Sequence, residues 1–395
     1  MMEEGAELIN RPFLDLRAAA DLLMKLYELK AADIEEMKSF TDQNFHIKLD
    51  IPITVGCSGN ERSDQFVLKL YNSKDSTDGN RVELAVNTMA YLSNKEFCCP
   101  QPVRNKHGKL VHLEKVSCDE GNTGVEGNNG KHGLFLVVLL SFMPGQLLSS
   151  LDPMPKEVIV CIGRKLAQLH KILEASLVGS ADKDCNLQRL VKDFEDYNRE
   201  KPSTYCSGEW SLERVTGQRH LLDLVDDTRL RAAIAKVIDL YEEHVEPVRH
   251  LFKKGIIHGD INNDNVIISK QLESHQPSNK RFIVSGIIDF GEAAYSCLIF
   301  DLAVGLSELL LVNGTSASKH FLQGYLSLNS IPDIEKKLLY YLVLVRYAQR
   351  IMLSLEAKPR DPLNDYIMQD VENCAGLLLQ LLQMQKGEVE TIWNI

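Results

Sequence analysis

Three polar residues near the middle of the chain have the types and spacing that phosphoryl transfer from a nucleotide requires. Asp260 is followed five residues later by Asn265, and Asp289 lies 24 residues beyond that, each beside a short apolar run. In such a set, one carboxylate accepts the proton of the attacking hydroxyl, and an Asn and an Asp bind Mg²⁺ against the phosphates. The pattern therefore predicts Asp260 as a catalytic base and Asn265 and Asp289 as metal ligands.

Two strands are expected to position these side chains. Val266–Ser269 and Phe282–Ile288 are apolar and rich in β-branched residues, and the polar stretch 270–281 between them contains a proline. Such a hairpin carries Asn265 and Asp289 at neighbouring strand ends, where both can face one ion. Mg²⁺ suits this pair because it takes oxygen ligands and keeps several waters.

Each motif also has a structural interpretation when it is considered separately. His258-Gly259-Asp260 is a common turn sequence, and Asp289-Phe290-Gly291 alone carries little information. Their order in the chain, each beside a predicted strand, favours a kinase over two unrelated turns.

Length and composition bound the class of protein. At 395 residues the chain is long enough for two lobes or domains, and 44% hydrophobic with 25% charged residues is ordinary for a globular protein. The formal net charge of -11 argues against a general nucleic-acid binder. No apolar run is long enough to span a bilayer, so no membrane partner is expected.

The cysteines and the N-terminus bear on compartment. The nine cysteines are scattered and lack the paired spacing of a zinc site, and the acidic N-terminus lacks the order of a signal peptide. We therefore expect a cytoplasmic protein. Nothing in the sequence indicates an oligomeric state.

Hydrophobic periodicity divides the chain near residues 141–146. In the N-terminal part we expect a helix over 12–30, strands at Phe45–Leu49 and Gln65–Tyr71, a helix over 81–93, a hairpin over Val103–Leu113 and a buried strand at Leu134–Phe142. We expect the C-terminal part to be mainly helical, over 156–173, 222–253, 299–313, 316–327 and 332–388. The expected fold class is α+β, with a β-rich N-terminal lobe over 1–141 and a helical C-terminal lobe over 142–395.

Taken together, the motifs resemble the aminoglycoside phosphotransferase family of small-molecule kinases. The rear carries Leu166–His170, His258-Gly259-Asp260 with Asn265, Ile288–Gly291 and Asp301-Leu302-Ala303. Further likeness lies in Thr41–His46, Phe66–Lys69, Ser285–Gly291 and Glu388–Trp393, and it extends from about residue 12 to 394. The resemblance implies a two-lobed protein-kinase-like fold, with Mg²⁺ and with GTP or ATP as the phosphoryl donor.

The resemblance also implies nucleotide-binding residues in the front lobe. Lys69 would contact the α- and β-phosphates, and Glu83, 14 residues later in a helix, would orient Lys69. The loop over the phosphates would include Asp42, Gln43 and Asn44. It lacks the glycine-rich run of protein kinases. The hinge over 139–142 would read a purine edge through backbone groups, with Leu139 and Ser141 as contacts.

Two departures from protein kinases concern regulation. Gly259 stands where protein kinases have an arginine that pairs with a phosphorylated activation loop, and a helix is expected within about eight residues of Gly291. Both indicate that there is no activation loop. Glu292 follows the Asp-Phe-Gly sequence, and it is expected either to contact a metal or a substrate amine, or to be a solvated side chain.

The expected acceptor is a small amino alcohol, and the resemblance implies 5-hydroxy-L-lysine. Its carboxylate requires a cation, and Arg346 lies in an otherwise apolar helical stretch, one turn before Arg350. Arg346 is therefore a candidate carboxylate ligand, with a structural ion pair as the alternative. Glu292 and Glu308 are the candidate ligands of an ammonium group.

Other functions stay open at this point. A kinase of choline, homoserine, an aminoglycoside or another amino alcohol would carry the same motifs. A catalytically silent nucleotide-binding pseudokinase is a different class, and it usually lacks the base or a metal ligand. Asp260, Asn265, Asp289 and Lys69 are all present, which favours an enzyme.

Overall fold

The computed structural model describes most of the chain in two compact units, Met1–Met143 and Pro144–Ile395. The lobe boundary expected from the sequence lies between residues 141 and 142. The described residues are 11–39, 41–55, 61–117, 132–178, 183–200, 208–272, 280–315, 317–359, 362 and 365–395.

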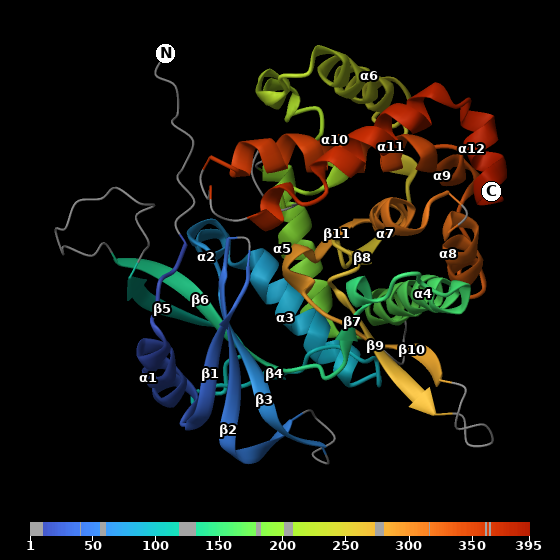
Figure 1. Ribbon diagram of the computed structural model, residues 1–395. Helices are drawn as coiled ribbons and strands as arrows, with labels where there is room; N and C mark the ends of the chain where they lie inside the picture. The colour runs from blue at the N-terminus through green and yellow to red at the C-terminus, as the bar shows by residue number, and fades with distance from the viewer. Residues whose placement is uncertain are drawn as a thin grey trace. The chain divides into compact units, whose positions relative to one another are not determined.

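The N-terminal unit is built on a six-stranded antiparallel sheet (Figure 1). The strand order is β1-β2-β3-β6-β4, and β5 also pairs with β6. The strands are β1 (Ala31–Met37), β2 (Gln43–Val55), β3 (Glu61–Leu70), β4 (Pro102–Val103), β5 (His112–Ser117) and β6 (His132–Ser141).

Helix α1 (Leu16–Tyr27) forms the core of this unit with one face of the sheet. Asp15 caps its N-terminus by accepting a hydrogen bond from the Ala18 N–H at 2.7 Å. Its buried face carries Leu23 and Leu26, which belong to the same cluster as Phe45 and Leu68 of the sheet. Two further helices, α2 (Ser73–Asp78) and α3 (Asn80–Ser93), follow β3.

Two expectations for this unit are wrong. The segment Val103–Leu113 is not a hairpin, because β4 and β5 on either side of the turn each pair with β6 rather than with one another. Strand β1 was not expected, because it contains Asp33, Glu35 and Glu36. It is an edge strand in which all three of these acidic residues are exposed, so their side chains are tolerated there.

The C-terminal unit is mainly helical, as expected (Figure 1). Its longer helices are α4 (Lys156–Val178), α5 (Cys185–Glu200), α6 (Thr228–His244), α7 (Leu298–Asn313), α8 (Ala317–Leu326), α10 (Leu339–Ala357), α11 (Val371–Gln383) and α12 (Lys386–Trp393), with α9 (Asp333–Lys336) a single turn. None of the described helices has both the length and the apolar character needed to cross a bilayer.

Close backbone packing joins α4 to α8. A Cβ added at Gly163 would lie 2.0 Å from the Phe321 carbonyl oxygen, and one at Gly324 would lie 2.0 Å from the Val160 carbonyl oxygen. Glycine at both positions therefore lets the two backbones touch. This contact fixes α4, which supplies a buried histidine of the site.

Short strands carry the polar residues of this unit. β9 (Val266–Leu272) pairs with β10 (Lys280–Ile287) and with β7 (Gln146–Leu147), and β8 (Lys254–Ile257) pairs with β11 (Ala294–Cys297). The predicted hairpin is thus present, with longer strands than expected. Only β11 and a 3₁₀ turn lie between Asp289 and α7, so no activation loop intervenes.

Candidate active site

The loop between β8 and β9 contains the predicted base, and its backbone is fixed by one buried carboxylate. Asp301, on the first turn of α7, is fully buried. Its Oδ1 accepts the Gly259 N–H at 2.7 Å, and its Oδ2 accepts the His258 N–H at 2.8 Å. Oδ2 also accepts from His170 Nε2 at 2.9 Å.

These donors keep Asp301 ionised. Burial alone would raise the pKa of Asp301, but the hydrogen bond from His170 and the nearby imidazoles and Gly259 N–H hold it below its ordinary value. His170 is in turn oriented by Tyr325, whose hydroxyl lies 3.0 Å from Nδ1. The ionised carboxylate therefore holds the loop through two backbone N–H groups.

His258 and Gly259 set the shape of the loop just before the base. His258 Nε2 donates to the Ile288 carbonyl at 2.9 Å, and its Nδ1 accepts from the Asp260 N–H at 3.2 Å. Gly259 has φ +84°, and an added Cβ would lie 2.3 Å from the Glu292 carbonyl oxygen. No side chain, arginine included, fits at position 259 without a backbone shift.

The Asp260 carboxylate is held by two amides and a guanidinium. Its Oδ2 accepts from Asn262 Nδ2 at 2.7 Å and from Asn265 Nδ2 at 2.9 Å. Its Oδ1 accepts from Arg346 Nη2 at 2.8 Å. The Asp260 side chain is 25% exposed, so a hydroxyl group can approach this carboxylate.

Arg346 lies on α10 with a side chain that is 4% exposed. Its guanidinium carbon is 5.1 Å from the centre of the Trp210 ring, in the range of a cation–π contact. The structure thus brings Arg346 to the predicted base. The open alternative for Arg346, an ion pair with an acidic residue, is present in the described protein, and its partner is Asp260.

The neighbouring Arg350 bonds to two carboxylates. It bonds to Glu308 through Nη1 and to Asp370 at 2.8 Å through Nη2. Burial raises the pKa of Glu308 above its ordinary value, although Arg350 and Arg346 oppose this effect. Two arginines one turn apart on α10 therefore have different partners.

Asn265 and Asp289 lie at the paired ends of β9 and β10. The Ile288 N–H donates to the Asn265 carbonyl at 2.9 Å, next to the last rungs of the hairpin. Because Asn265 Nδ2 is used by Asp260, the amide oxygen is the atom left for a cation. Asp289 is exposed, and its φ of 56° places it in the left-handed region.

The donor types fit Mg²⁺. One amide oxygen and one carboxylate are too few for a closed protein cage, but Mg²⁺ is commonly held by one or two protein oxygens plus phosphates and water. Among the described residues, no group of three His, Cys, Asp or Glu side chains could hold a metal. An ion at Asn265 and Asp289 would therefore depend on ligands from the substrate.

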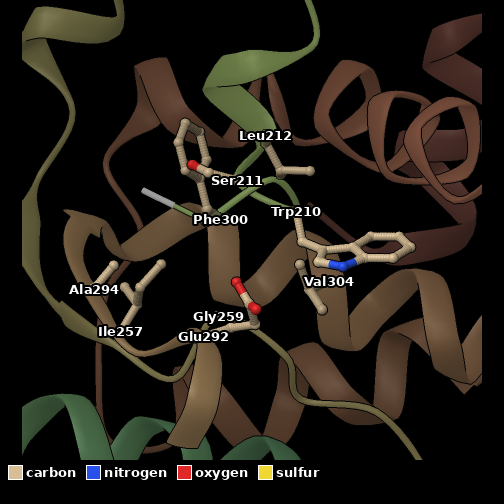
Figure 2. Close-up of a pocket in the computed structure, with 10 residues that line it drawn as sticks. Trp210, Ser211, Leu212, Ile257, Gly259, Glu292, Ala294, Phe300 and Val304 are labelled. Atoms are coloured by element: carbon tan, nitrogen blue, oxygen red, sulfur yellow. The ribbon is translucent and has the colours of Figure 1, made fainter. Parts of the chain in front are cut away.

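A pocket lies beside the loop between β8 and β9 (Figure 2). Figure 2 shows the Trp210 indole and the Glu292 carboxylate among the side chains around it. Gly259, next to the predicted base, also lines it. Its lining residues are Gly208, Trp210, Ser211, Leu212, Ile257, Gly259, Glu292, Ala294, Phe300 and Val304.

In the N-terminal unit, Lys69 is paired differently from the expectation. Lys69 Nζ lies 3.1 Å from Asp42 Oδ2, with side chains 9% and 15% exposed. Asp42 Oδ1 accepts from the Asn72 N–H at 2.9 Å and from Asn72 Nδ2 at 3.0 Å. Glu83 is exposed and has no ion-pair partner in the part of the chain that the structure describes. The predicted Lys69–Glu83 pair is wrong, because α3 turns position 83 to solvent.

Gln43 and Asn44, the other two residues of the predicted phosphate loop, differ in whether their side-chain amides already have hydrogen-bond partners. Gln43 is 1% exposed and is used internally, since Nε2 donates to Leu14 and Oε1 accepts the Leu14 N–H at 2.9 Å. Asn44 is directly opposite Lys69 in the β2–β3 register and shares its face of the sheet. Its Oδ1 is buried without a hydrogen-bond partner among the described residues. Asn44 therefore has an atom to offer a ligand, whereas the Gln43 side chain is occupied.

The two hinge residues are also engaged within the N-terminal unit. Leu139 has no exposed surface and belongs to the core cluster. The Ser141 N–H donates to the Gln101 carbonyl, and Ser141 Oγ accepts the Gln101 N–H, both at 2.9 Å. The Leu139 side chain and these Ser141 atoms are therefore not open to a ligand.

Three residues of the site were not among the predicted site residues. Asn262 lies within the catalytic loop, where its polar type was a usable signal. Asp301 was noted only as part of a family motif. A second signal was its place as the one charged residue in the apolar stretch 298–306, and the structure shows that it is buried. Trp210 had none, because nothing in the local sequence connects it to Arg346.

Comparisons with known proteins agree with this geometry. Residues 57–336 match the model of the phosphotransferase enzyme family. The chain is 28% identical to hydroxylysine kinase of Xenopus laevis over 97% of this chain and 94% of the relative. It is 24% identical to hydroxylysine kinase of Mus musculus over 97% of this chain and 93% of the relative.

Solved structures show the fold. An amicoumacin kinase in complex with AMP-PNP, Ca²⁺ and amicoumacin matches with a TM-score of 0.60 at 13% identity, covering 95% of this chain and 97% of that chain. A microcompartment-associated aminopropanol kinase matches with a TM-score of 0.54 at 16% identity, covering 93% of this chain and 98% of that chain. The expected protein-kinase-like fold is confirmed. The chain belongs to the phosphotransferase enzyme family and is a kinase that acts on a hydroxyl acceptor.

Proposed function

We propose that this kinase transfers the γ-phosphoryl group of GTP or ATP to the hydroxyl of 5-hydroxy-L-lysine. Four hydroxylysine kinases, each 24–28% identical over at least 97% of this chain, support the substrate. The observation that carries the proposal is the Arg346–Asp260 contact of 2.8 Å, since it places a cation for a substrate carboxylate beside the proposed base.

Asp260 is the proposed general base. The acceptor hydroxyl gives its proton to Asp260 as its oxygen bonds to the γ-phosphorus, and the bond between that phosphorus and the bridging oxygen breaks to leave a nucleoside diphosphate. Asn262 and Asn265 orient the carboxylate through Oδ2. Asp301 keeps the loop in place through its two backbone contacts.

Mg²⁺, when bound, neutralises phosphate charge, and Asn265 and Asp289 are the proposed ligands. Lys69 is proposed to contact the nucleotide phosphates, with Asp42 as the carboxylate that orients it. The unpaired amide oxygen of Asn44 and main-chain carbonyls near Leu139 and Ser141 are further proposed nucleotide contacts.

The acceptor is proposed to use the pocket beside the loop. At neutral pH, 5-hydroxylysine carries two ammonium groups and one carboxylate. Arg346 is the proposed partner of the carboxylate, and Glu292 in the pocket lining is the proposed partner of an ammonium group. Trp210 supplies an aromatic wall that packs on the aliphatic part of such a substrate.

The test is a nucleotide-consumption assay on purified full-length protein. Hydroxylysine, choline, homoserine, ethanolamine and kanamycin are compared with GTP and with ATP, and an Asp260→Asn variant reports background hydrolysis. We expect hydroxylysine to have the highest kcat/KM. Turnover of choline or another alcohol with no turnover of hydroxylysine would contradict the substrate while leaving the kinase activity intact.

A further inference from the structure

The two oxygens of the Asp260 carboxylate differ in how many further hydrogen bonds they can accept. Each carboxylate oxygen offers about two lone-pair directions. Oδ2 already accepts two amide hydrogens, from Asn262 and Asn265. A substrate hydroxyl must therefore bond to Oδ1, which is the oxygen that Arg346 contacts at 2.8 Å.

Arg346 also has unused hydrogen-bonding capacity. Its Nε is buried without a partner among the described residues, and its Nη1 reaches the Trp210 carbonyl only at 3.5 Å. A buried donor without a partner is destabilising. The guanidinium carbon nevertheless lies 5.1 Å from the centre of the Trp210 ring. The side chain is thus placed to accept an additional anionic partner.

Arg350 provides an internal comparison on the same helix. Its guanidinium bonds to two carboxylates, those of Glu308 and Asp370. Arg346 has one carboxylate partner, and that partner is the proposed base. Of these two arginines, Arg346 is the one that contacts the proposed base and keeps a buried donor without a partner among the described residues.

We propose that Arg346 couples substrate recognition to release of the base. Without substrate, Arg346 holds Asp260 at Oδ1. When an amino acid substrate binds, its carboxylate takes over the Arg346 guanidinium, and Oδ1 loses the cation that lowers its basicity while the substrate hydroxyl bonds to its remaining lone pair. This inference rests on the proposed function, and it predicts that the substrate class is hydroxy-amino acids, because an amino alcohol without a carboxylate leaves the base engaged.

The first experiment compares hydroxylysine with 1,5-diamino-2-pentanol, which is the same molecule without its carboxylate. In the wild-type protein we expect kcat, and not only KM, to be about 10- to 100-fold lower for the diamino alcohol, as for loss of a charged hydrogen bond. Arg346→Gln should lower kcat/KM for hydroxylysine by a similar factor and raise that for the diamino alcohol, because the variant no longer holds Asp260 Oδ1 with a cation. Arg346→Lys should give intermediate discrimination.

Two outcomes would overturn the coupling. One is an equal loss for both substrates in Arg346→Gln, which is what a merely structural arginine gives. The other is a wild-type kcat that is the same for both substrates, with the difference confined to KM. Failure of wild-type protein to phosphorylate either compound would instead contradict the proposed acceptor, and the next experiment then decides the coupling.

The second experiment measures binding and needs no turnover. Lysine and cadaverine, which differ only by the carboxylate, are titrated by calorimetry into wild-type protein and Asp260→Asn. Because the variant frees Arg346, we expect it to bind lysine several-fold more tightly than wild type does, and cadaverine no more tightly. Unchanged or weaker lysine binding in the variant would refute the exchange of partners.

Discussion

Two partly buried ion pairs, one in each unit, have the same construction and different proposed roles. Asp42 gives one oxygen to the two N–H groups of Asn72 and the other to Lys69. Asp260 gives one oxygen to the amides of Asn262 and Asn265 and the other to Arg346. In the N-terminal unit only the cation is proposed to contact a ligand, whereas in the C-terminal unit both Asp260 and Arg346 are.

The difference lies in what supports each pair. Asp42 immediately precedes the first residue of β2. Among the described residues, both amide groups that bond to its carboxylate belong to Asn72. Asp260 lies on a loop whose backbone is bonded to the fully buried Asp301. A general base must be held within hydrogen-bond reach of its proton. The pair whose carboxylate is the proposed base is therefore the one with the additional backbone support.

The largest expected effect comes from removing the support of the C-terminal pair. Asp301→Ala leaves His170 and two backbone N–H groups without their buried carboxylate, so we expect a loss of about 3–5 kcal/mol in the free energy of unfolding. Chemical denaturation measures it. Asp301→Asn, which keeps the shape, should be less damaging. A loss below about 1 kcal/mol in the alanine variant would show that the loop is held by other contacts.

The proposed metal ligand comes next. Asp289→Asn should lower kcat by about 10²–10³-fold, the usual effect of losing one electrostatic contact to a reacting group. Raising the Mg²⁺ concentration should recover part of the rate. Glu292→Gln, three residues later, is the matched control, and its loss should be smaller and independent of Mg²⁺. A rate in Asp289→Asn close to that of wild type would remove this residue from the metal site.

The N-terminal pair can be tested against the pairing first expected from the sequence. Asp42→Asn removes the carboxylate that orients Lys69, and we expect nucleotide KM or kcat to worsen by about 10- to 100-fold, as for loss of a charged hydrogen bond. Glu83→Gln changes an exposed side chain and should have an effect within about twofold. Steady-state kinetics with varied nucleotide compares them. The reverse ranking would restore Glu83 as the orienting residue.

The smallest effect concerns acid stability. Because the folded protein holds the pKa of Asp301 below its ordinary value, its charge contributes stability above the unfolded pKa of about 3.9, and that stability is lost as pH falls through the folded value. Wild-type melting temperature should therefore fall more steeply below about pH 4 than that of Asp301→Asn. Parallel curves for the two proteins would count against this assignment.

The sequence was informative where contacts are local. Asn265 and Asp289 could be placed at neighbouring strand ends because the hairpin between them is a short-range structure with a clear apolar pattern. The absence of an activation loop could likewise be inferred from the small number of residues between Gly291 and the start of α7. Such features depend on backbone geometry within a few dozen residues.

Long-range pairing could not be deduced in the same way. Lys69 and Glu83 lie at a plausible separation, but the rotation of α3 exposes Glu83, and Asp42 reaches Lys69 across a strand pair instead. The Arg346–Asp260 contact joins residues 86 positions apart. Charged residues have many candidate partners in a sequence, and only packing of the intervening helices selects one of them.

The most direct test of the central claim is single-turnover phosphoryl transfer to hydroxylysine by Asp260→Asn. We expect the rate to fall by about 10²–10⁴-fold with nucleotide affinity within about twofold of wild type, because the variant loses the proton acceptor and keeps the fold. Asp264→Asn, a change of the same kind in the same loop, should retain most of the rate. A rate in Asp260→Asn within a few-fold of wild type would contradict the assignment of Asp260 as the base.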